Sequence, residues 1–126
     1  MELYLDNYKG FVDAIIPIKD VNFFVGENST GKTAVLNLLE IVTSAYFWVE
    51  PDFNQEGIDL GYFSEMVSQF GNDKRSFSIG VYMDEDASQS PYNGYVWLKF
   101  MERDSSPAIS EFRFICGLKS VWCYVG

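Results

Sequence analysis

Residues 26–33 constrain the fold more than any other part of the chain. They read Gly-Glu-Asn-Ser-Thr-Gly-Lys-Thr and fit the pattern G-x-x-x-x-G-K-[ST]. An apolar stretch at 21–25 precedes them, and after Lys32 apolar residues recur at steps of three and four. A strand before this pattern and a helix after it are the context in which the pattern is meaningful. The segment therefore predicts an α/β domain in which a glycine-rich loop joins a buried strand to a helix.

The residue types of this loop suit a phosphate group. Gly26 and Gly31 let the backbone turn tightly, so that its N–H groups and the helix N-terminus form a nest for an anion. Lys32 can reach the β- and γ-phosphates as a mobile charge, and Thr33 can offer a hydroxyl to Mg²⁺. The pattern predicts a Mg²⁺–nucleoside triphosphate and does not separate ATP from GTP. The predicted binding residues are Gly26, Glu27, Asn28, Ser29, Thr30, Gly31, Lys32 and Thr33, with Thr33 also on the metal.

Composition excludes several classes of protein. The 126 residues suffice for one domain, and an aromatic content of 17% excludes a disordered chain. Nine basic against 18 acidic residues give a net charge of −9, so the mean field does not attract nucleic acid. Two cysteines without histidine argue against a zinc site and predict free thiols in a reducing cytoplasm. No apolar run is long enough for a bilayer, and the N-terminus lacks the basic start of a signal peptide.

Periodicity predicts the remaining elements. Alternation indicates strands near Leu3, at 11–18, 77–83, 95–101, 109–116 and 118–125, with the strand at 77–83 half-exposed. Helical spacing predicts one helix from 32 to 49, stopped by Pro51, and a shorter one at 60–70, with a loop at 52–59 between them. The expected fold is a single α/β lobe over 1–126, with a mixed sheet around the helix that follows the glycine-rich loop. Residues 1–50 hold the strands, loop and helix, 51–74 a loop and short helix, and 75–126 an antiparallel meander.

Hydrolysis needs an acidic residue at the end of a buried strand next to the phosphate loop, the Walker B position. Asp84 and Glu85 are the only candidates, and Asp84 lies 84 − 32 = 52 residues after the lysine. Ser76, Ser78 and Gly80 alternate with apolar residues in the strand before them, whereas a Walker B strand is apolar on both faces. This pattern favours a solvated acidic loop and leaves Asp84 and Glu85 as weak catalytic candidates.

The N-terminal third resembles the ATPase heads of the ABC type. The likeness is closest to the branch of RecF, the structural-maintenance-of-chromosomes proteins and the overcoming-lysogenisation-defect (OLD) nucleases. These heads begin with a strand and an Asn-Phe-Lys-like segment, which here is Asn-Tyr-Lys-Gly-Phe at 7–11. Asn28 occupies the place of the asparagine in their loop, and Glu27 with Asn28 is similar to loops of OLD-like and retron-associated defence ATPases. The resemblance covers residues 1–50 well and the rest in outline.

The resemblance implies further site residues and missing parts. Lys9 would lie near the nucleotide, and Gln69 is the only glutamine placed for the family's Mg²⁺-contacting glutamine loop. A solvated turn lysine and an exposed helix position are the alternatives for these two residues. The sequence has no Leu-Ser-Gly-Gly signature and no switch histidine. We therefore expect a fragment, a truncated frame or a split half. A homodimer or a complementary chain would supply the signature and Walker B motifs, and the isolated lobe would expose apolar surface.

The function implied is Mg·ATP binding as the first lobe of an ABC-type ATPase, without complete hydrolysis by this chain alone. Such a head would gate an effector or a DNA-handling module in bacterial defence or DNA maintenance, touching nucleic acid only through other domains or partners. Two alternatives stay open. One is a self-contained P-loop phosphotransferase or NTPase that uses Asp84 or Glu85, and the other is a non-catalytic nucleotide sensor subunit.

Overall fold

The computed structural model describes residues 1–18, 30–55, 57–67, 75–83, 94–116 and 119–125. The elements, in chain order, are β1 (Glu2–Asp6), β2 (Ala14–Pro17), α1 (Thr30–Val42), α2 (Ala45–Val49), β3 (Asn54–Gln55), β4 (Ile58–Asp59), α3 (Phe63–Met66), β5 (Ser76–Met83), β6 (Gly94–Arg103), β7 (Ser106–Cys116) and β8 (Lys119–Tyr124). The domain is therefore a mixed α/β structure dominated by sheet.

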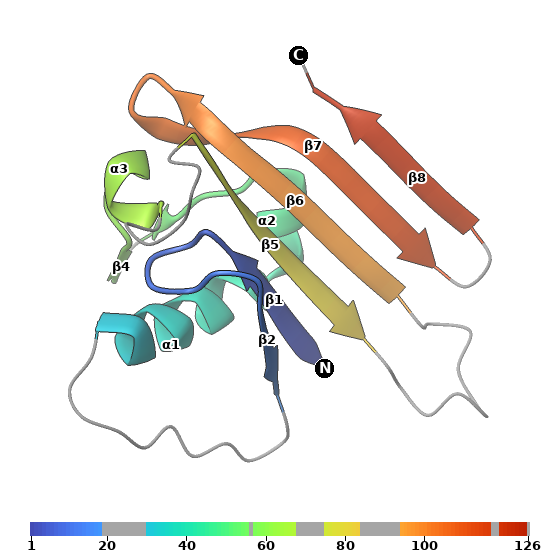
Figure 1. Ribbon diagram of the computed structural model, residues 1–126, viewed down its shortest axis with the longest axis horizontal. Helices are drawn as coiled ribbons and strands as arrows, with labels where there is room; N and C mark the ends of the chain where they lie inside the picture. Colours follow the sequence, from blue (N-terminus) through green and yellow to red (C-terminus); the bar gives the residue numbers. More distant parts are fainter. Residues whose placement is uncertain (19–29, 56, 68–74, 84–93, 117–118, 126) are drawn as a thin grey trace.

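Six of these strands form one sheet, in the order β2-β1-β5-β6-β7-β8, and the short β3 and β4 pair separately (Figure 1). Every pairing between described strands is antiparallel. The meander expected at 75–126 is thus confirmed by β5 to β8. The expected mixed sheet needs a parallel member, and the strand predicted at 21–25 lies outside the described residues.

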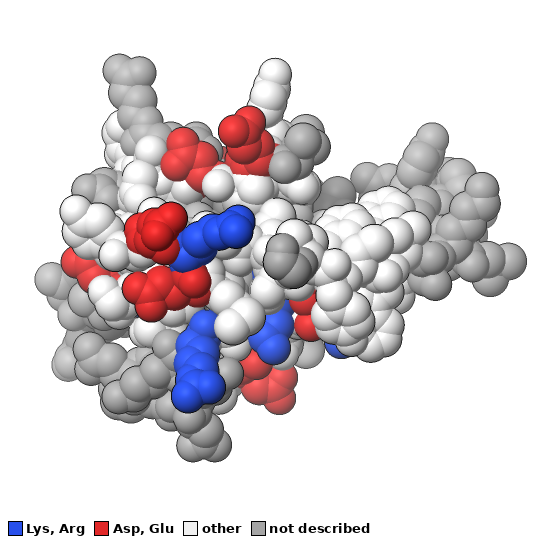
Figure 2. Space-filling model, turned by 90° about the horizontal axis from the view of Figure 1, so that it is seen from above, with Lys and Arg blue, Asp and Glu red and all other residues white. Residues whose placement is uncertain are grey.

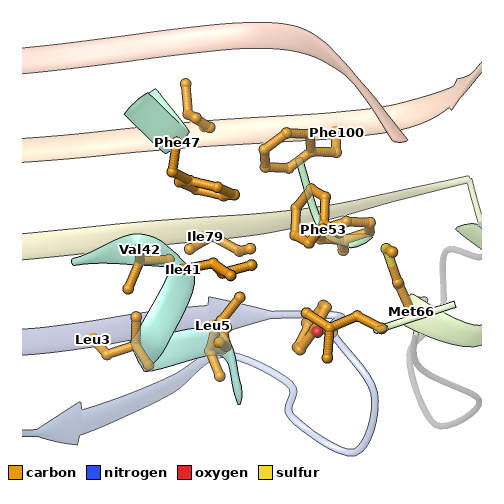
Figure 3. Close-up of a cluster of buried hydrophobic side chains, with 14 of the residues drawn as sticks. Leu3, Leu5, Ile41, Val42, Phe47, Phe53, Met66, Ile79 and Phe100 are labelled. Atoms are coloured by element: carbon orange, nitrogen blue, oxygen red, sulfur yellow. The ribbon is translucent and has the colours of Figure 1, made fainter. Parts of the chain in front are cut away.

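The core lies between one face of the sheet and the helices. Ile41 and Val42 of α1 and Phe47 of α2 pack in the same cluster as Leu3, Leu5, Ile79 and Phe100 of the sheet (Figure 3). Several aromatic rings pack against one another in the middle of this core, and Phe77 stacks on Phe100 with 5.1 Å between ring centroids. Many of the chain's aromatic residues lie in this core, where large rings bury much apolar area in a small domain.

The helix predicted from 32 to 49 is two helices, so this prediction is wrong in its middle. α1 ends at Val42, and α2 begins at Ala45 after Ser44, whose backbone is extended (φ −82°, ψ 129°). The Thr43 hydroxyl donates to the Glu40 carbonyl at 3.0 Å, and the indole N–H of Trp48 donates to the Val42 carbonyl at 3.0 Å. Side-chain bonds of this kind compete with the helical ladder and favour a break.

Two shorter segments also differ from expectation. The loop predicted at 52–59 contains the β3–β4 pair, and the helix predicted at 60–70 is the single turn α3 in its described part. The strand predicted at 11–18 is shorter, because 11–13 belong to the loop after β1. Within the parts of the chain that the structure describes, no helix combines the length and apolarity needed to cross a membrane.

From Ser76 to Val81 the strand β5 is buried on both faces, which corrects the half-exposed strand expected at 77–83, whereas Tyr82 is 38% exposed. Ser76 and Ser78 are 8% and 6% exposed, and Gly80 is also buried. β5 lies between β1 and β6, and a Cβ on Gly80 would sit 3.2 Å from Cδ1 of Trp97. The glycine therefore allows the Trp97 indole to lie over the strand. Alternation of small and apolar residues reflected close packing here, and did not reflect contact with solvent.

Candidate functional site

The first turn of α1 contains the second half of the glycine-rich motif. α1 begins at Thr30, so Gly31, Lys32 and Thr33 have helical backbone, as the motif predicts. Gly26, Glu27, Asn28 and Ser29 lie outside the described residues. The leading N–H groups of any α-helix lack intrahelical acceptors. The motif residues at this end of α1 therefore supply backbone donors for an external group.

The charges at this helix start are suited to an anion. The first turn of α1 holds no acidic residue, although the chain has 18, and it does hold Lys32. A cation at a helix N-terminus opposes the helix dipole, whereas an acidic group favours it. α3 shows the ordinary arrangement, since Glu65 in its first turn accepts the Tyr62 N–H at 2.6 Å. An anion held at α1 would complement both the dipole and Lys32.

Packing fixes the direction of α1. Val35, Leu38 and Ile41 are at most 3% exposed and belong to the same buried cluster as Leu3 and Leu5 of β1. From Val35 to Val42, one face of α1 thus packs on the sheet (Figure 3). A site at its N-terminus is held by the core of the domain, which is the support that a precisely placed binding group requires.

The loop between β1 and β2 carries Lys9 in a strained backbone. Asn7, Lys9 and Asp13 have φ of 60°, 50° and 47°, values that non-glycine residues rarely adopt. Hydrogen bonds hold the loop: the Lys9 N–H donates to the Met66 carbonyl at 2.5 Å, and the Asn7 amide donates to the Ser76 carbonyl at 2.7 Å. Strain of this kind costs on the order of 1–3 kcal/mol per residue and clusters at functional sites. The loop and the start of α1 lie toward the same end of the view in Figure 1.

Carboxylates also fix this loop from the β1 side. Asp6 accepts the Asp13 N–H at 2.9 Å, and the Tyr4 hydroxyl donates to the Asp13 carboxylate at 3.2 Å. Burial, followed by the charges of Asp6 and Asp13, raises the pKa of Tyr4 to about 12. The hydroxyl therefore stays protonated near neutral pH and remains a donor to Asp13.

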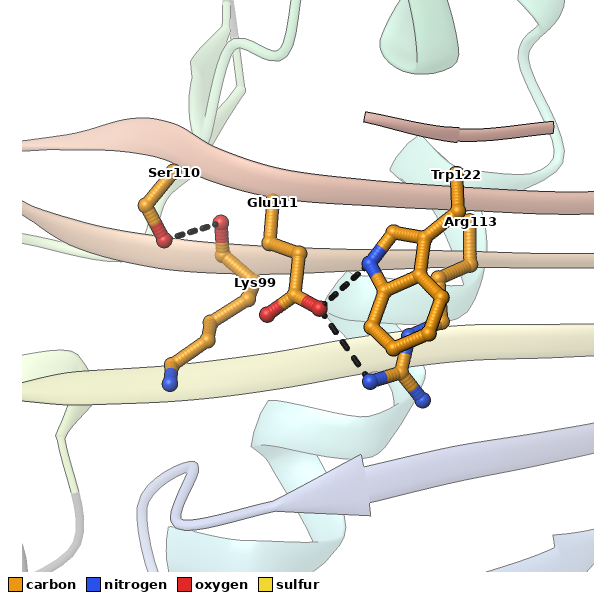
Figure 4. Close-up of polar contacts among 5 residues, drawn as sticks. All are labelled: Lys99, Ser110, Glu111, Arg113 and Trp122. Atoms are coloured by element: carbon orange, nitrogen blue, oxygen red, sulfur yellow. Dashed lines mark hydrogen bonds and ion pairs between the residues drawn. The ribbon is translucent and has the colours of Figure 1, made fainter. Parts of the chain in front are cut away.

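A second polar cluster lies on the opposite face of the sheet. Glu111 accepts the Trp122 indole N–H at 2.6 Å and pairs with Arg113 at 3.1 Å (Figure 4). The Arg113 guanidinium lies 4.6 Å from the Trp97 ring and 4.1 Å from the Trp122 ring. The sequence did not single out this cluster. Only the strand register reveals this cluster, because it places positions 97, 113 and 122 in one row across β6, β7 and β8.

Comparison with known protein families resolves the class of the domain. Residues 1–105 match the AAA ATPase domain family. The chain belongs to the AAA ATPase domain family. The match includes the motif at 26–33, the β1–β2 loop and β1 to β6, whereas β7 and β8 lie beyond it. Comparisons with curated proteins and with solved structures gave no match.

The donor set of this AAA ATPase domain fits a nucleotide. ATPases of this family bind nucleotide and usually Mg²⁺. The first turn of α1 contains a lysine, a threonine and backbone N–H groups that have no acceptor within the helix, and it contains no acidic residue. Lys9 has no placement relative to a nucleotide, and its role stays a prediction. Gln69, Asp84 and Glu85 lie outside the described residues, so their assignments also stay predictions.

Replacing Lys9 by glycine separates the charge of Lys9 from its backbone. We expect Lys9→Gly to raise the free energy of unfolding by about 0.5–1 kcal/mol, because glycine adopts φ near 50° without strain. If the ammonium contacts the nucleotide, the same variant binds Mg·ATP more weakly. Denaturant unfolding and calorimetric titration measure the two effects. Lys9→Arg keeps the charge and should retain affinity; equal affinity in Lys9→Gly would show that Lys9 is only a turn residue.

The Tyr8 hydroxyl is buried, and among the residues that the structure describes it has no hydrogen-bond partner, although Tyr8 is 0% exposed. Burial raises the pKa of this hydroxyl above its ordinary value. We expect Tyr8→Phe to stabilise the fold by about 1 kcal/mol, since an unsatisfied buried hydroxyl carries a desolvation penalty. Thermal and denaturant unfolding measure this, with Tyr46→Phe as an exposed control. A loss of stability in Tyr8→Phe would mean that the hydroxyl is satisfied in solution.

Proposed function

We propose that this chain binds Mg·ATP through residues 26–33 as the first lobe of an ABC-type ATPase head. One observation carries the proposal: Lys32 stands in an α1 first turn without acidic residues, inside a domain of the AAA ATPase family. A helix start of this kind is unfavourable for the protein alone and favourable around a polyanion. The packing of α1 on β1 and β5 keeps this helix start in place.

Each residue of the proposed site has a distinct task. The backbone N–H groups of the loop and of the first turn cradle the phosphates, and Lys32 holds the terminal phosphates by charge. Thr33 orients the metal through its hydroxyl, with Gln69 as a further candidate ligand. Lys9 would approach the nucleotide from the β1–β2 loop. The bound Mg·ATP supplies a phosphoanhydride bond whose cleavage is favourable.

The finer assignment is the RecF, structural-maintenance-of-chromosomes and OLD branch. It is supported by Asn28 in the loop and by the segment 7–11, which forms the strained and closely held loop after β1. In this proposal two heads enclose nucleotide, either in a homodimer or with a complementary chain, and the missing motifs come from a complementary chain. Nucleotide then gates an effector or DNA-handling module in the cytoplasm, in bacterial defence or DNA maintenance, with nucleic acid bound by other parts.

The second candidate is a self-contained NTPase that uses Asp84 or Glu85. The burial of β5 on both faces from 76 to 81 favours it, because Asp84 follows this central strand in the sequence. The antiparallel pairing of β5 with β1 and β6 counts against it, since a Walker B strand lies beside the phosphate-loop strand. A nucleotide sensor without turnover is the third outcome to distinguish.

The deciding experiment follows binding and phosphate release together. Mg·ATP and Mg·GTP are titrated into the chain by calorimetry, and released phosphate is measured in the same samples. Saturable binding without phosphate release supports a first lobe. Steady release that is lost in Asp84→Asn supports the self-contained enzyme instead. Absence of binding in a folded chain would contradict the proposed site.

A further inference from the structure

β8 forms one edge of the six-stranded sheet (Figure 1). Its side chains are exposed on both faces: Val121 is 49% exposed, Trp122 is 56% exposed and Tyr124 is 74% exposed. The other edge, β2, has four residues and ends at Pro17, features that discourage pairing with another strand. The described part of β8 has neither proline nor a charge within 120–124. β8 therefore resembles an edge that accepts a further strand.

The backbone of β8 presents three sets of hydrogen-bonding groups at this edge. Val125 donates its N–H toward β7, to the Ser110 carbonyl, at 2.8 Å. In antiparallel pairing, alternate residues direct both N–H and C=O to the same side. Positions 121 and 123 therefore also bond toward β7, and positions 120, 122 and 124 direct their groups outward. These outward groups are arranged symmetrically about position 122, so two copies of the strand can pair with each other around that position.

We propose that β8 pairs with β8 of a second copy of this chain, antiparallel and centred on Trp122. In this register each Trp122 opposes the other, and position 124 opposes 120, so all three outward sets are used in both copies. Position 121 opposes 123, valine against cysteine, and Lys119 opposes Val125. No two like charges face each other, and the tyrosine faces the small serine. The contact is a two-fold interface of the kind commonest in homodimers.

Contacts within the single chain already hold the Trp122 side chain in position. Its indole N–H donates to Glu111 at 2.6 Å, and the Arg113 guanidinium lies over its ring. The Tyr124 ring packs beside it, tilted by 36°, with ring centroids 5.7 Å apart. Exposed aromatic residues already fixed in position lose little freedom on binding, and Trp, Tyr and Arg dominate the energetics of interfaces. A cross-strand aromatic pair at the two-fold axis adds to the stability.

The charge distribution favours pairing at this edge over other surfaces. Residues 119–125 contain no acidic residue, although the chain carries a net charge of −9. In the view of Figure 2, the acidic and basic side chains lie toward the left and centre, and the described surface toward the right is mostly uncharged. The net charges of two copies still repel each other at long range. Added salt should therefore strengthen the dimer, because it screens that repulsion.

Sedimentation of the reduced chain, between about 1 and 300 µM, is the first test. We expect the mass to rise from 14.4 kDa to twice that value with concentration in nucleotide-free buffer, where a dimer that encloses Mg·ATP cannot contribute. Val121→Lys places a charge opposite Cys123 of the other copy and should shift the midpoint to at least tenfold higher concentration. Val12→Lys is the matched control, since Val12 is also 49% exposed. A monomer at all concentrations, or equal effects of both variants, would overturn the proposal.

Cross-linking tests the register itself. Val121→Cys, made with Cys116→Ser so that Cys123 is the only native thiol, brings the introduced thiol directly opposite Cys123 of the other copy. The spacing of opposed residues in a non-hydrogen-bonded pair, about 4.5 Å between Cα atoms, lies within the range of disulfides. We expect a covalent dimer on mild oxidation. Val125→Cys, four residues away, is the control and should stay monomeric; equal cross-linking of both variants would contradict this register.

Discussion

Phe77→Ala is expected to lower the free energy of unfolding by about 3–5 kcal/mol, the range observed when a buried aromatic residue is truncated to alanine. Phe77 is 1% exposed, and its ring lies within 6 Å of the rings of Tyr8, Phe53, Phe63 and Phe100. It joins the β1–β2 loop, β5, β6 and α3 in one cluster. The total free energy of unfolding of a domain is only about 5–15 kcal/mol, so this loss is a large fraction of it.

Equilibrium denaturation in urea, checked by thermal unfolding, measures this loss. Tyr46→Ala is the matched control, because Tyr46 is 81% exposed on α2 and its truncation should change stability by less than about 0.5 kcal/mol. If Phe77→Ala and Tyr46→Ala were equally mild, Phe77 would not be part of a closed core. The placement of the loop that carries Lys9 would then lose its support.

Lys32→Ala is expected to weaken Mg·ATP binding by roughly 100-fold or more, since removing one partner of a desolvated charge pair costs about 2–5 kcal/mol. The apo protein should be as stable as the wild type, or more stable by about 0.3–1 kcal/mol. A lysine in the first turn opposes the helix dipole, and alanine is the best helix former. Loss of affinity with retained stability is the combination that distinguishes a ligand-binding lysine from a structural one.

Lys99→Ala is the control for a general effect of charge. It removes the same positive charge from β6, at a pocket on the face of the sheet opposite α1, where Lys99 lies near Glu111 (Figure 4). We expect affinity for Mg·ATP in Lys99→Ala to stay within about twofold of the wild type, because Lys99 lies across the sheet from α1 and acts on a ligand there only at long range, where salt screens charges. Equal losses in the two variants would show that Lys32 acts only through the net charge.

The sequence predicted the elements whose signal is local. The helix start at the glycine-rich motif, the end of the helical region before Pro51 and the meander of β5 to β8 follow from turn residues, periodicity and alternation. The family match over residues 1–105 confirms the ATPase class that the motif indicated. In each case neighbouring residues carry enough information to specify the local structure.

Features that depend on distant neighbours were missed. Ser76, Ser78 and Gly80 suggested a half-exposed strand, but the central place of β5 and the ring of Trp97 bury it. The break between α1 and α2 depends on the hydrogen bond from Trp48 to the Val42 carbonyl and on the packing of Phe47 in the core. The row of Trp97, Arg113 and Trp122 exists only once three strands are in register, which no local pattern specifies.

The most direct measurement is a calorimetric titration of Mg·ATP into the wild-type chain and into Lys32→Ala, side by side, on samples shown to be equally folded. We predict saturable binding to the wild type at one nucleotide per chain. In Lys32→Ala, the heat of binding should be too small to fit at the same concentrations. Equal binding by both proteins would contradict the placement of the nucleotide at the start of α1.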